Sequence, residues 1–152
     1  MDNKKFYEYV FQGGGKRVIT SLPDNIHRQF VSDELETAYD YVVEKGKTAN
    51  VYLNPNSRRD NLPPGGRGSD DDIIFVTAFV ADIDVLGPAH KEQNLPPTKQ
   101  DAMDVLNDLP ANPSFIVDSG YGLYAYYIFE NPIDTIDDGQ RKYVAAIYKR
   151  IW

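Results

Sequence analysis

The feature that most constrains the fold is one apolar run, residues 73–85 (IIFVTAFVADIDV). It is rich in β-branched and aromatic residues, and its length suits a strand buried in the middle of a sheet. Asp82 and Asp84 interrupt its final residues. Alternate residues of a strand point to the same face, so both carboxylates should leave one face, about 6.5–7 Å apart along the chain. The run predicts a sheet protein with paired acids at the end of a central strand.

The paired acids are candidate metal ligands. Two like charges placed together at the end of an apolar strand are costly unless a positive charge compensates them. Mg²⁺ and Mn²⁺ prefer carboxylate oxygens, so either ion is a suitable partner for Asp82 and Asp84. The alternative is a strand that simply ends in exposed aspartates, and the Asp-x-Asp pattern alone does not decide between the two. The acidic stretch 70–72 is expected to be a solvated loop.

The rest of the chain alternates strand and helix patterns. Short strands are predicted at 6–11, 17–22, 49–53, 114–118 and 123–129. Helices are predicted from Ser32 as N-cap to Gly46, from Thr98 as cap (with Asp101 three residues on) to about Leu109, and from Asp138 to the chain end. Residues 54–72 hold three Pro and three Gly and are predicted to form a long loop. Together these elements predict an α+β fold, a mixed β-sheet with packed helices, in a single domain over residues 1–152.

The composition restricts the chemistry. The chain contains no cysteine, which excludes disulfides, thiolate zinc sites and a cysteine nucleophile. Neither a signal peptide nor a membrane-spanning segment is recognisable, so we expect a cytoplasmic protein with no membrane partner. The net charge of −7 opposes broad nucleic-acid binding, which depends on neutralising phosphates. Any such contact must be local, and the candidate cations are Lys16, Arg17, Arg58, Arg59 and Arg67.

A second motif follows the strand at 114–118. The segment from Ser119 to Gly122 (SGYG) is predicted to be a tight turn between two strands. Its glycines, Gly120 and Gly122, would let backbone N–H groups approach a phosphate closely, and Ser119 adds a hydroxyl donor. A plain hairpin with core tyrosines is the alternative. The glycines at 13–15 lack the Gly-Lys-Ser/Thr ending of a P-loop, so that nucleotide site is excluded.

The two motifs together resemble the archaeo-eukaryotic primase superfamily, especially the primase-polymerases of phages, plasmids and other mobile elements. The resemblance covers nearly the whole chain. The first family motif, two aspartates separated by one residue, is matched by Asp82 and Asp84. The second, Ser-Gly-x-Gly-x-His, is matched by Ser119, Gly120 and Gly122, with Tyr124 where the family has histidine. Tyrosine can hydrogen-bond a phosphate but carries no positive charge.

This resemblance implies template-directed nucleotidyl transfer, the work of a DNA primase and polymerase in replication of a phage or other mobile element. Asp82 and Asp84 would hold Mg²⁺ or Mn²⁺, and the turn with Tyr124 would bind a nucleotide triphosphate, with Arg67 as a further contact. Single-stranded DNA would be the template, and the host cytoplasm the location if a phage encodes the protein. The fold implied is an RRM-like palm.

The resemblance also implies that the chain is the N-terminal portion of a catalytic core. The family's third motif, another metal-binding carboxylate, is expected beyond the last helix, and that helix stops uncapped at Ile151 and Trp152. We therefore expect a piece of a longer protein, with downstream domains such as a helicase, and such a piece need not polymerise by itself. The two histidines, His27 and His90, are expected on the surface.

Two other functions remain open. A catalytically silent nucleic-acid-binding or assembly module would explain the tyrosine at position 124 and the missing third motif. A metal-dependent phosphohydrolase would use the same aspartates on another substrate. Metal-dependent nucleotide incorporation on a template distinguishes the first function from both.

Overall fold

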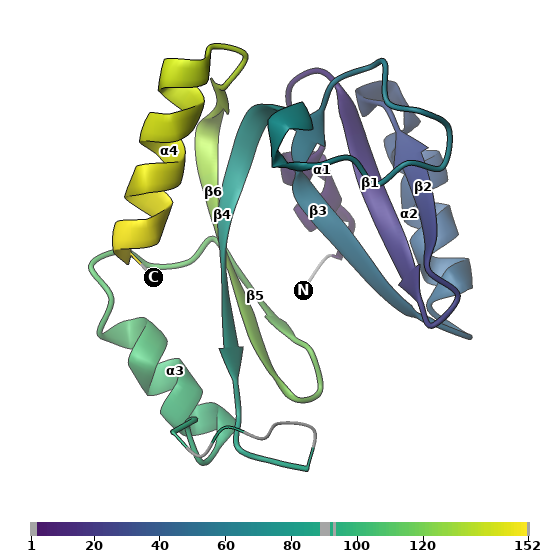
Figure 1. Ribbon diagram of the computed structural model, residues 1–152. Helices are drawn as coiled ribbons and strands as arrows, with labels where there is room; N and C mark the ends of the chain where they lie inside the picture. The colour runs from purple at the N-terminus through teal and green to yellow at the C-terminus, as the bar shows by residue number, and fades with distance from the viewer. Residues whose placement is uncertain (1–2, 89–91, 93, 152) are drawn as a thin grey trace. The chain divides into compact units, whose positions relative to one another are not determined.

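The computed structural model describes residues 3–88, 92 and 94–151. In that part of the chain the fold is α+β, as predicted, with four α-helices and one six-stranded sheet (Figure 1). The helices are α1 (Asn3–Val10), α2 (Leu35–Lys45), α3 (Lys99–Asn107) and α4 (Asp138–Ile151). The strands are β1 (Lys16–Leu22), β2 (Ile26–Phe30), β3 (Asn50–Arg58), β4 (Ile73–Asp84), β5 (Phe115–Asp118) and β6 (Gly122–Asp134). Two short 3₁₀ turns, η1 (Ser32–Glu34) and η2 (Asp70–Asp72), precede α2 and β4.

The strand order in the sheet is β2-β1-β3-β4-β6-β5. The pairs β1–β2, β1–β3, β3–β4 and β5–β6 are all antiparallel. The predicted mixed sheet is therefore wrong. Its α+β character is retained because short turns join β1 to β2 and β5 to β6, and strands joined by short turns must run antiparallel.

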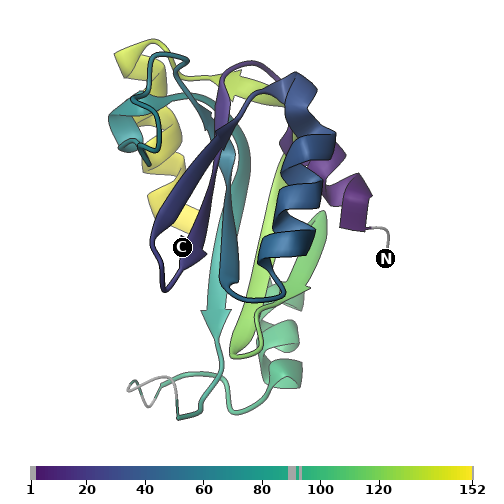
Figure 2. The ribbon, with the colours of Figure 1, turned by 90° about the vertical axis from the view of Figure 1, so that its right-hand side faces the viewer.

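The chain divides into two compact units, residues 1–78 with 129–151 and residues 79–128. Strands β4 and β6 each contribute residues to both units. In the first unit α1 packs against α2, and the rings of Tyr7 and Tyr39 meet edge to face with centroids 5.4 Å apart. Ala38 of α2 is fully buried, and the turned view shows α2 running along the strands of this unit (Figure 2). The single-domain prediction is not tested by this division.

The predicted strand at 6–11 is wrong, because this segment lies in α1 and the turn that follows it. Tyr7, Val10 and Phe11 are all buried, and their i, i+3, i+4 spacing belongs to one helix face. Sequence reasoning also missed β2, whose residues (IHRQF) are mostly polar and alternate between more and less exposed positions. Such a pattern suits an edge strand, which carries little hydrophobic signal.

The predicted loop 54–72 is also too long. Strand β3 continues to Arg58, pairing Lys16 with Arg58 and Ser57 with Phe75. The Asn56 side-chain carbonyl accepts hydrogen bonds from the backbone N–H groups of Thr77 and Ala78, at 3.0 and 3.2 Å. The Asn56 side chain thus takes the place of main-chain pairing between β3 and β4 at this position. The sequence Asn-Pro-Asn gives no indication of such pairing.

Of the two predicted helix N-caps, one is found and one is not. Thr98 caps α3, accepting from Asp101 N at 3.2 Å while the Asp101 carboxylate accepts from Thr98 N at 2.9 Å. Ser32 is not the cap of α2, because the η1 turn intervenes and Glu34 takes that position. The Ser32 hydroxyl donates instead to the carbonyl of Gly13. Gly46 ends α2, as predicted, and donates to Val42 O at 2.8 Å.

Two of the cations proposed for nucleic-acid contact are buried, so that prediction is wrong for them. Arg17 has 0% and Arg58 3% of its surface exposed. Arg58 donates to Arg67 O at 2.8 Å and so holds the loop after β3. Burial lowers the pKa of Arg17 to about 10, so its guanidinium still carries its charge at neutral pH.

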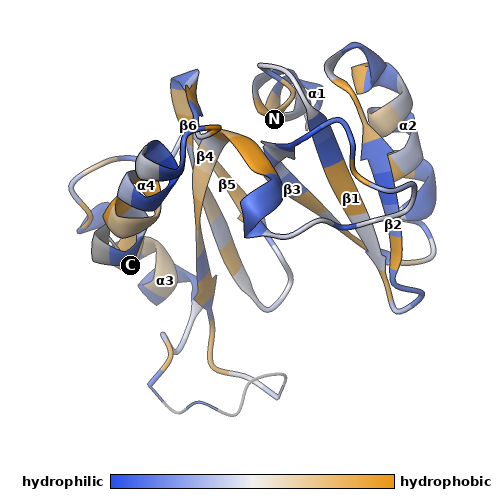
Figure 3. Cartoon of the chain, turned by 45° about the horizontal axis from the view of Figure 1, so that its top comes forward, coloured by the Kyte–Doolittle hydropathy of each residue, from blue (hydrophilic) through white to orange (hydrophobic). Residues whose placement is uncertain are grey.

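The other cations near the same loop have structural partners. Lys16 donates to Gln29 Oε1 at 3.0 Å, and Arg59 pairs with Asp72 at 3.0 Å. Figure 3 shows the hydrophilic colour of η2 giving way to hydrophobic residues where β4 begins. The acidic stretch 70–72, expected to be a solvated loop, is thus a 3₁₀ turn that Arg59, directly after β3, holds through Asp72. Across the described ranges, no helix is long and apolar enough to cross a membrane.

Candidate functional site

The end of β4 places Asp82 and Asp84 on one face, as the strand pattern predicts. Ala81, Ile83 and Val85 all belong to the hydrophobic cluster of the second unit, which α3 supplies with Ala102 and Leu106. Side chains of a strand alternate, so the two aspartates project from the opposite face. Asp82 is exposed and Asp84 is half-buried.

The residues of strand β6 alternate between the same two faces of the sheet. Leu123, Ala125 and Tyr127 belong to the same cluster as α3. Tyr124, which is half-buried, therefore points to the face that carries the two aspartates. Its partner across the sheet is Val117 of β5. Tyr124 is thus on the carboxylate face.

The glycine turn lies directly against the end of β4. A Cβ atom on Gly122 would come within 2.3 Å of Ile83 O and 2.9 Å of Asp84 Cα. Val85 N also donates to Tyr121 O at 3.0 Å. The two sequence motifs, 37 residues apart between Asp82 and Ser119 in the printed sequence, therefore meet at one place in the second unit.

Substitution of Gly122 should destabilise the protein more than substitution of Gly120. Gly122→Ala must push β6 away from the β4 backbone, and overpacking of this kind costs about 1–3 kcal/mol. Gly120 has a φ of +92° but open space around its missing Cβ, so Gly120→Ala meets only backbone strain of about 1 kcal/mol. Urea unfolding of the two variants checks the order. An equal loss for both would mean that the close approach at Gly122 relaxes freely.

Two backbone N–H groups of the turn already have hydrogen-bond acceptors close to them in the chain. Ser119 N donates to Gly122 O at 3.0 Å, and Gly120 N donates to Asp118 Oδ1 at 2.8 Å. These two amides are therefore hydrogen-bonded within the turn and do not point to an open phosphate cradle. Ser119 is exposed, and the donor role that the sequence suggests for its hydroxyl stays a prediction.

Lys99 and Asp118 are site residues that sequence reasoning did not identify. Lys99 Nζ lies 2.6 Å from Asp118 Oδ1 and 2.7 Å from Oδ2, which links the first residue of α3 to the last residue of β5. The Lys99 ammonium, and after it the Gly120 N–H, lower the pKa of Asp118 below its ordinary value. The only signal in the sequence is their position: Lys99 directly follows the Thr98 cap, and Asp118 directly precedes the Ser-Gly turn.

The contacts of the Asp118 carboxylate should be lost at acidic pH, because the carboxylate becomes protonated. The carboxylate is stabilised in the folded protein, so this stabilisation is complete above the ordinary pKa of 3.8 and is lost as the pH falls through the lower folded value. An NMR titration below pH 5 is expected to show the Gly120 amide shifting together with the Asp118 carboxyl. In an Asp118→Asn variant that transition should be absent. A Gly120 amide that titrates equally in both proteins would contradict this coupling.

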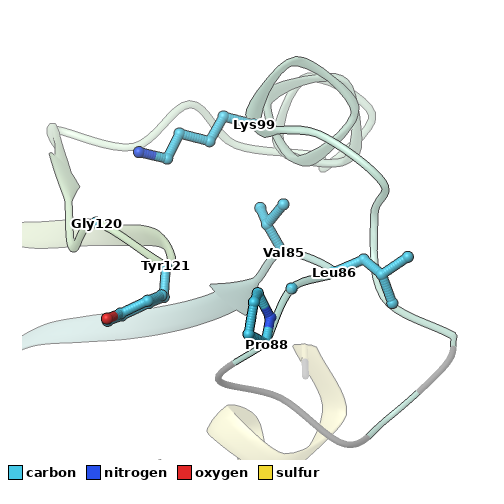
Figure 4. A pocket seen from close by; sticks show the side chains of 7 residues that line it. Val85, Leu86, Pro88, Lys99, Gly120 and Tyr121 are labelled. Atoms are coloured by element: carbon cyan, nitrogen blue, oxygen red, sulfur yellow. The ribbon is translucent and has the colours of Figure 1, made fainter.

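A shallow pocket of about 200 Å³ lies beside the turn (Figure 4). Figure 4 shows Lys99 extending from the start of α3 toward Gly120. The lining residues are Val85, Leu86, Gly87, Pro88, Lys99, Gly120 and Tyr121. Neither Asp82 nor Asp84 is among them, so the pocket adjoins the end of β4 without containing the carboxylates.

The donor set at the end of β4 fits a metal that substrate helps to hold. In the described part of the chain, no group of three or more His, Asp or Glu side chains is arranged to bind a metal. Two carboxylates on one face suffice for Mg²⁺ or Mn²⁺ only when water and substrate phosphates supply the other ligands. Asp82 and Asp84 offer such a pair.

The remaining predicted residues belong to the first unit or fall outside the described residues. Arg67 belongs to the first unit, where its side chain is exposed, and its role stays a prediction. His27 is half-buried rather than fully on the surface, and its Nδ1 lies 2.9 Å from Thr20 Oγ1. His90 and Trp152 fall outside the described residues.

Comparison with known proteins leaves the site to be interpreted from its own geometry. No protein-family model matches the chain, and no curated protein or solved structure is significantly similar to it.

Proposed function

We propose that this chain carries the metal- and nucleotide-binding part of a primase-polymerase, which performs template-directed nucleotidyl transfer. The observation that carries the proposal is the meeting of two motifs. Asp82 and Asp84 leave one face of β4, and Gly122 packs against the backbone of Ile83 and Asp84. A turn with an exposed hydroxyl donor beside a carboxylate pair is an arrangement that suits metal-assisted phosphoryl chemistry.

Each residue has a role in this proposal. Asp82 and Asp84 hold Mg²⁺ or Mn²⁺, which when bound supplies charge stabilisation for a reacting 3′-hydroxyl and a departing pyrophosphate. The Ser119 hydroxyl donates to a phosphate oxygen, while Gly122 keeps the turn close to β4. Tyr124 offers a phenol on the carboxylate face as a neutral hydrogen-bond partner for sugar or phosphate. Arg67, on the loop after β3, stays a predicted nucleotide contact.

A silent binding module is the second candidate, and one observation favours it. The amides of Ser119 and Gly120 are hydrogen-bonded inside the turn, so fewer donors face a triphosphate than the motif suggests. A module of this type would bind nucleotide or single-stranded DNA without needing metal. A phosphohydrolase that uses the same aspartates has no separate observation in its favour.

The deciding assay is incorporation of labelled nucleotides on a primed or unprimed single-stranded DNA template. We expect incorporation with Mn²⁺ or Mg²⁺ and none in excess EDTA. Release of phosphate without incorporation would instead identify a phosphohydrolase. Metal-independent, salt-sensitive binding of DNA with no incorporation would support the silent module, and the variants that sharpen this assay are considered in the Discussion.

A further inference from the structure

The turn that carries Ser119 has little stiffness of its own. Two of its four residues are glycines, and Gly120 has a φ of +92° with open space where a Cβ atom would lie. Glycine loses more conformational freedom on ordering than any other residue. A defined position for the Ser119 hydroxyl therefore depends on contacts that hold the turn from outside.

Strand β4 holds the half of the turn that follows Ser119. Val85 N donates to Tyr121 O at 3.0 Å, and a Cβ atom on Gly122 would come within 2.3 Å of Ile83 O. The N–H of Ser119 donates to Gly122 O at 3.0 Å, which closes the hairpin. These bonds leave the next peptide group, between Ser119 and the residue after it, to be held by other means.

The carboxylate of Asp118 holds that peptide group. Its Oδ1 accepts from Gly120 N at 2.8 Å, so the carboxylate and the backbone form an Asx turn that encloses Ser119. The two carboxylate oxygens also lie 2.6 and 2.7 Å from Lys99 Nζ. The backbone of Ser119 is therefore enclosed by a ring whose carboxylate is oriented by Lys99.

Helix α3 gives Lys99 a fixed starting point. Lys99 is the first residue of that helix, directly after its capping box. Ala102 and Leu106, further along the helix, are buried in the hydrophobic cluster of the second unit. Figure 4 shows the Lys99 side chain extending from the start of the helix toward Gly120. The ion pair thus connects a helix packed on the core of this unit to the half of the turn that β4 does not hold.

The stability of the fold does not account for this ion pair. The side chains of Lys99 and Asp118 are 43% and 58% exposed, and ion pairs at exposed positions contribute little to the free energy of unfolding. The Lys99 ammonium, followed by the Gly120 N–H, lowers the pKa of Asp118, so the carboxylate is charged at neutral pH and serves both contacts. The effect of the pair is therefore expected in the geometry of the turn.

We infer that Lys99 and Asp118 are positioning residues, which hold the turn so that the Ser119 hydroxyl can donate to a substrate phosphate. The phosphate in this inference rests on the proposed function, whereas the bonds that hold the turn come from the structure. Neither residue needs to touch the substrate, because both act through the backbone that carries Ser119.

The first measurement needs no substrate. Asp118→Ala removes the acceptor of the Gly120 N–H, so hydrogen exchange of that amide, followed by NMR in EDTA, should become about tenfold faster. Lys99→Met leaves the carboxylate without its partner and should shift the Ser119 and Gly120 amide signals, whereas Lys99→Arg keeps a cation and should shift them less. Unchanged amides in either Asp118→Ala or Lys99→Met would overturn the inference.

The second measurement is the kinetics of nucleotide incorporation. Lys99→Met should raise the KM for nucleotide about two- to tenfold, the usual cost of ordering a mobile group on binding, and change kcat less than about twofold. Lys99→Arg should restore most of the lost affinity. Lys4→Met is the matched control, because Lys4 is 40% exposed and pairs with Glu36 at 2.6 Å in the other unit. An equal rise in KM for both methionine variants would contradict a local role of Lys99.

A Ser119→Ala background shows whether Lys99 acts through the hydroxyl. Once that hydroxyl is gone, Lys99→Met should raise KM by less than about twofold further, because the two substitutions remove one shared interaction. Effects of the two substitutions that multiply would overturn the positioning role while incorporation by wild type leaves the proposed function standing. Wild-type protein that incorporates no nucleotide would remove the proposed function, and with it the role given to Ser119.

Discussion

Replacing both Asp82 and Asp84 by Asn should reduce metal-dependent nucleotide incorporation by about 10³-fold or more while the protein stays folded. The isosteric amides keep the shape of each side chain but remove the negative charges that hold a divalent ion. Bound metal supplies several kcal/mol of transition-state stabilisation, and about 1.4 kcal/mol corresponds to a factor of ten in rate. The rates of wild type and variant, measured over a range of Mn²⁺ concentrations, give the result.

A charge-matched control makes the outcome specific. Asp104 and Asp108 are exposed at the end of α3, so their replacement by Asn removes the same charge without touching β4. We expect that control to keep wild-type incorporation. Far-UV circular dichroism and urea unfolding of the Asp82 and Asp84 double variant check that the fold is retained. Incorporation that survives the double substitution would remove the metal-site assignment.

Arg17→Met should lower the free energy of unfolding by about 3 kcal/mol. The buried guanidinium donates to three carbonyls, those of Val10 at 2.8 Å, Gly14 at 3.2 Å and Gln12. Methionine fills similar space but donates nothing, and each buried acceptor left without a partner costs about 1–3 kcal/mol. With a urea m-value of about 1–3 kcal/mol/M, the midpoint should fall by about 1–3 M.

Arg28 is the matched control for this change. It lies on β2, beside the strand of Arg17, but its side chain is exposed and its guanidinium sits 4.8 Å from the Tyr41 ring centroid. Arg28→Met should lose this contact and the longer one to the Phe30 ring at 5.9 Å, each worth about 0.5–1 kcal/mol or less at an exposed site. Equal destabilisation by the two variants would show that the Arg17 hydrogen bonds to the turn after α1 are replaced by water at little cost.

Local patterns account for the elements that were predicted well. The apolar run of β4, the Thr98 cap with Asp101, and the Ser-Gly turn between β5 and β6 each depend on residues close together in the chain. Capping, alternation and glycine turns are short-range effects, so a single sequence displays them. The α+β class follows from counting such elements.

The failures have a common cause in contacts between distant segments. Strand β2 is polar because it needs only one buried face at the sheet edge. Strand β3 extends to Arg58 because it pairs with β1 and β4, in part through the Asn56 side chain, which accepts from the β4 backbone. The sequence pattern of the aromatic segment 6–11 is compatible with either a short strand or a helix. Packing against α2, through Tyr7 and Tyr39, selected the helix.

For the candidate site, the sequence by itself determined that two carboxylates share one face of a strand, because side-chain alternation is a property of the strand alone. Only the tertiary structure decided that Gly122 packs on that strand, that Lys99 pairs with Asp118 across 19 residues, and that Arg17 is buried rather than available to nucleic acid. Each of these three features depends on a contact between segments that are separated in the sequence. A lysine or arginine in a sequence has the same charge whether its partner is a phosphate, a carboxylate or the carbonyls at a helix end, and folding chooses among them.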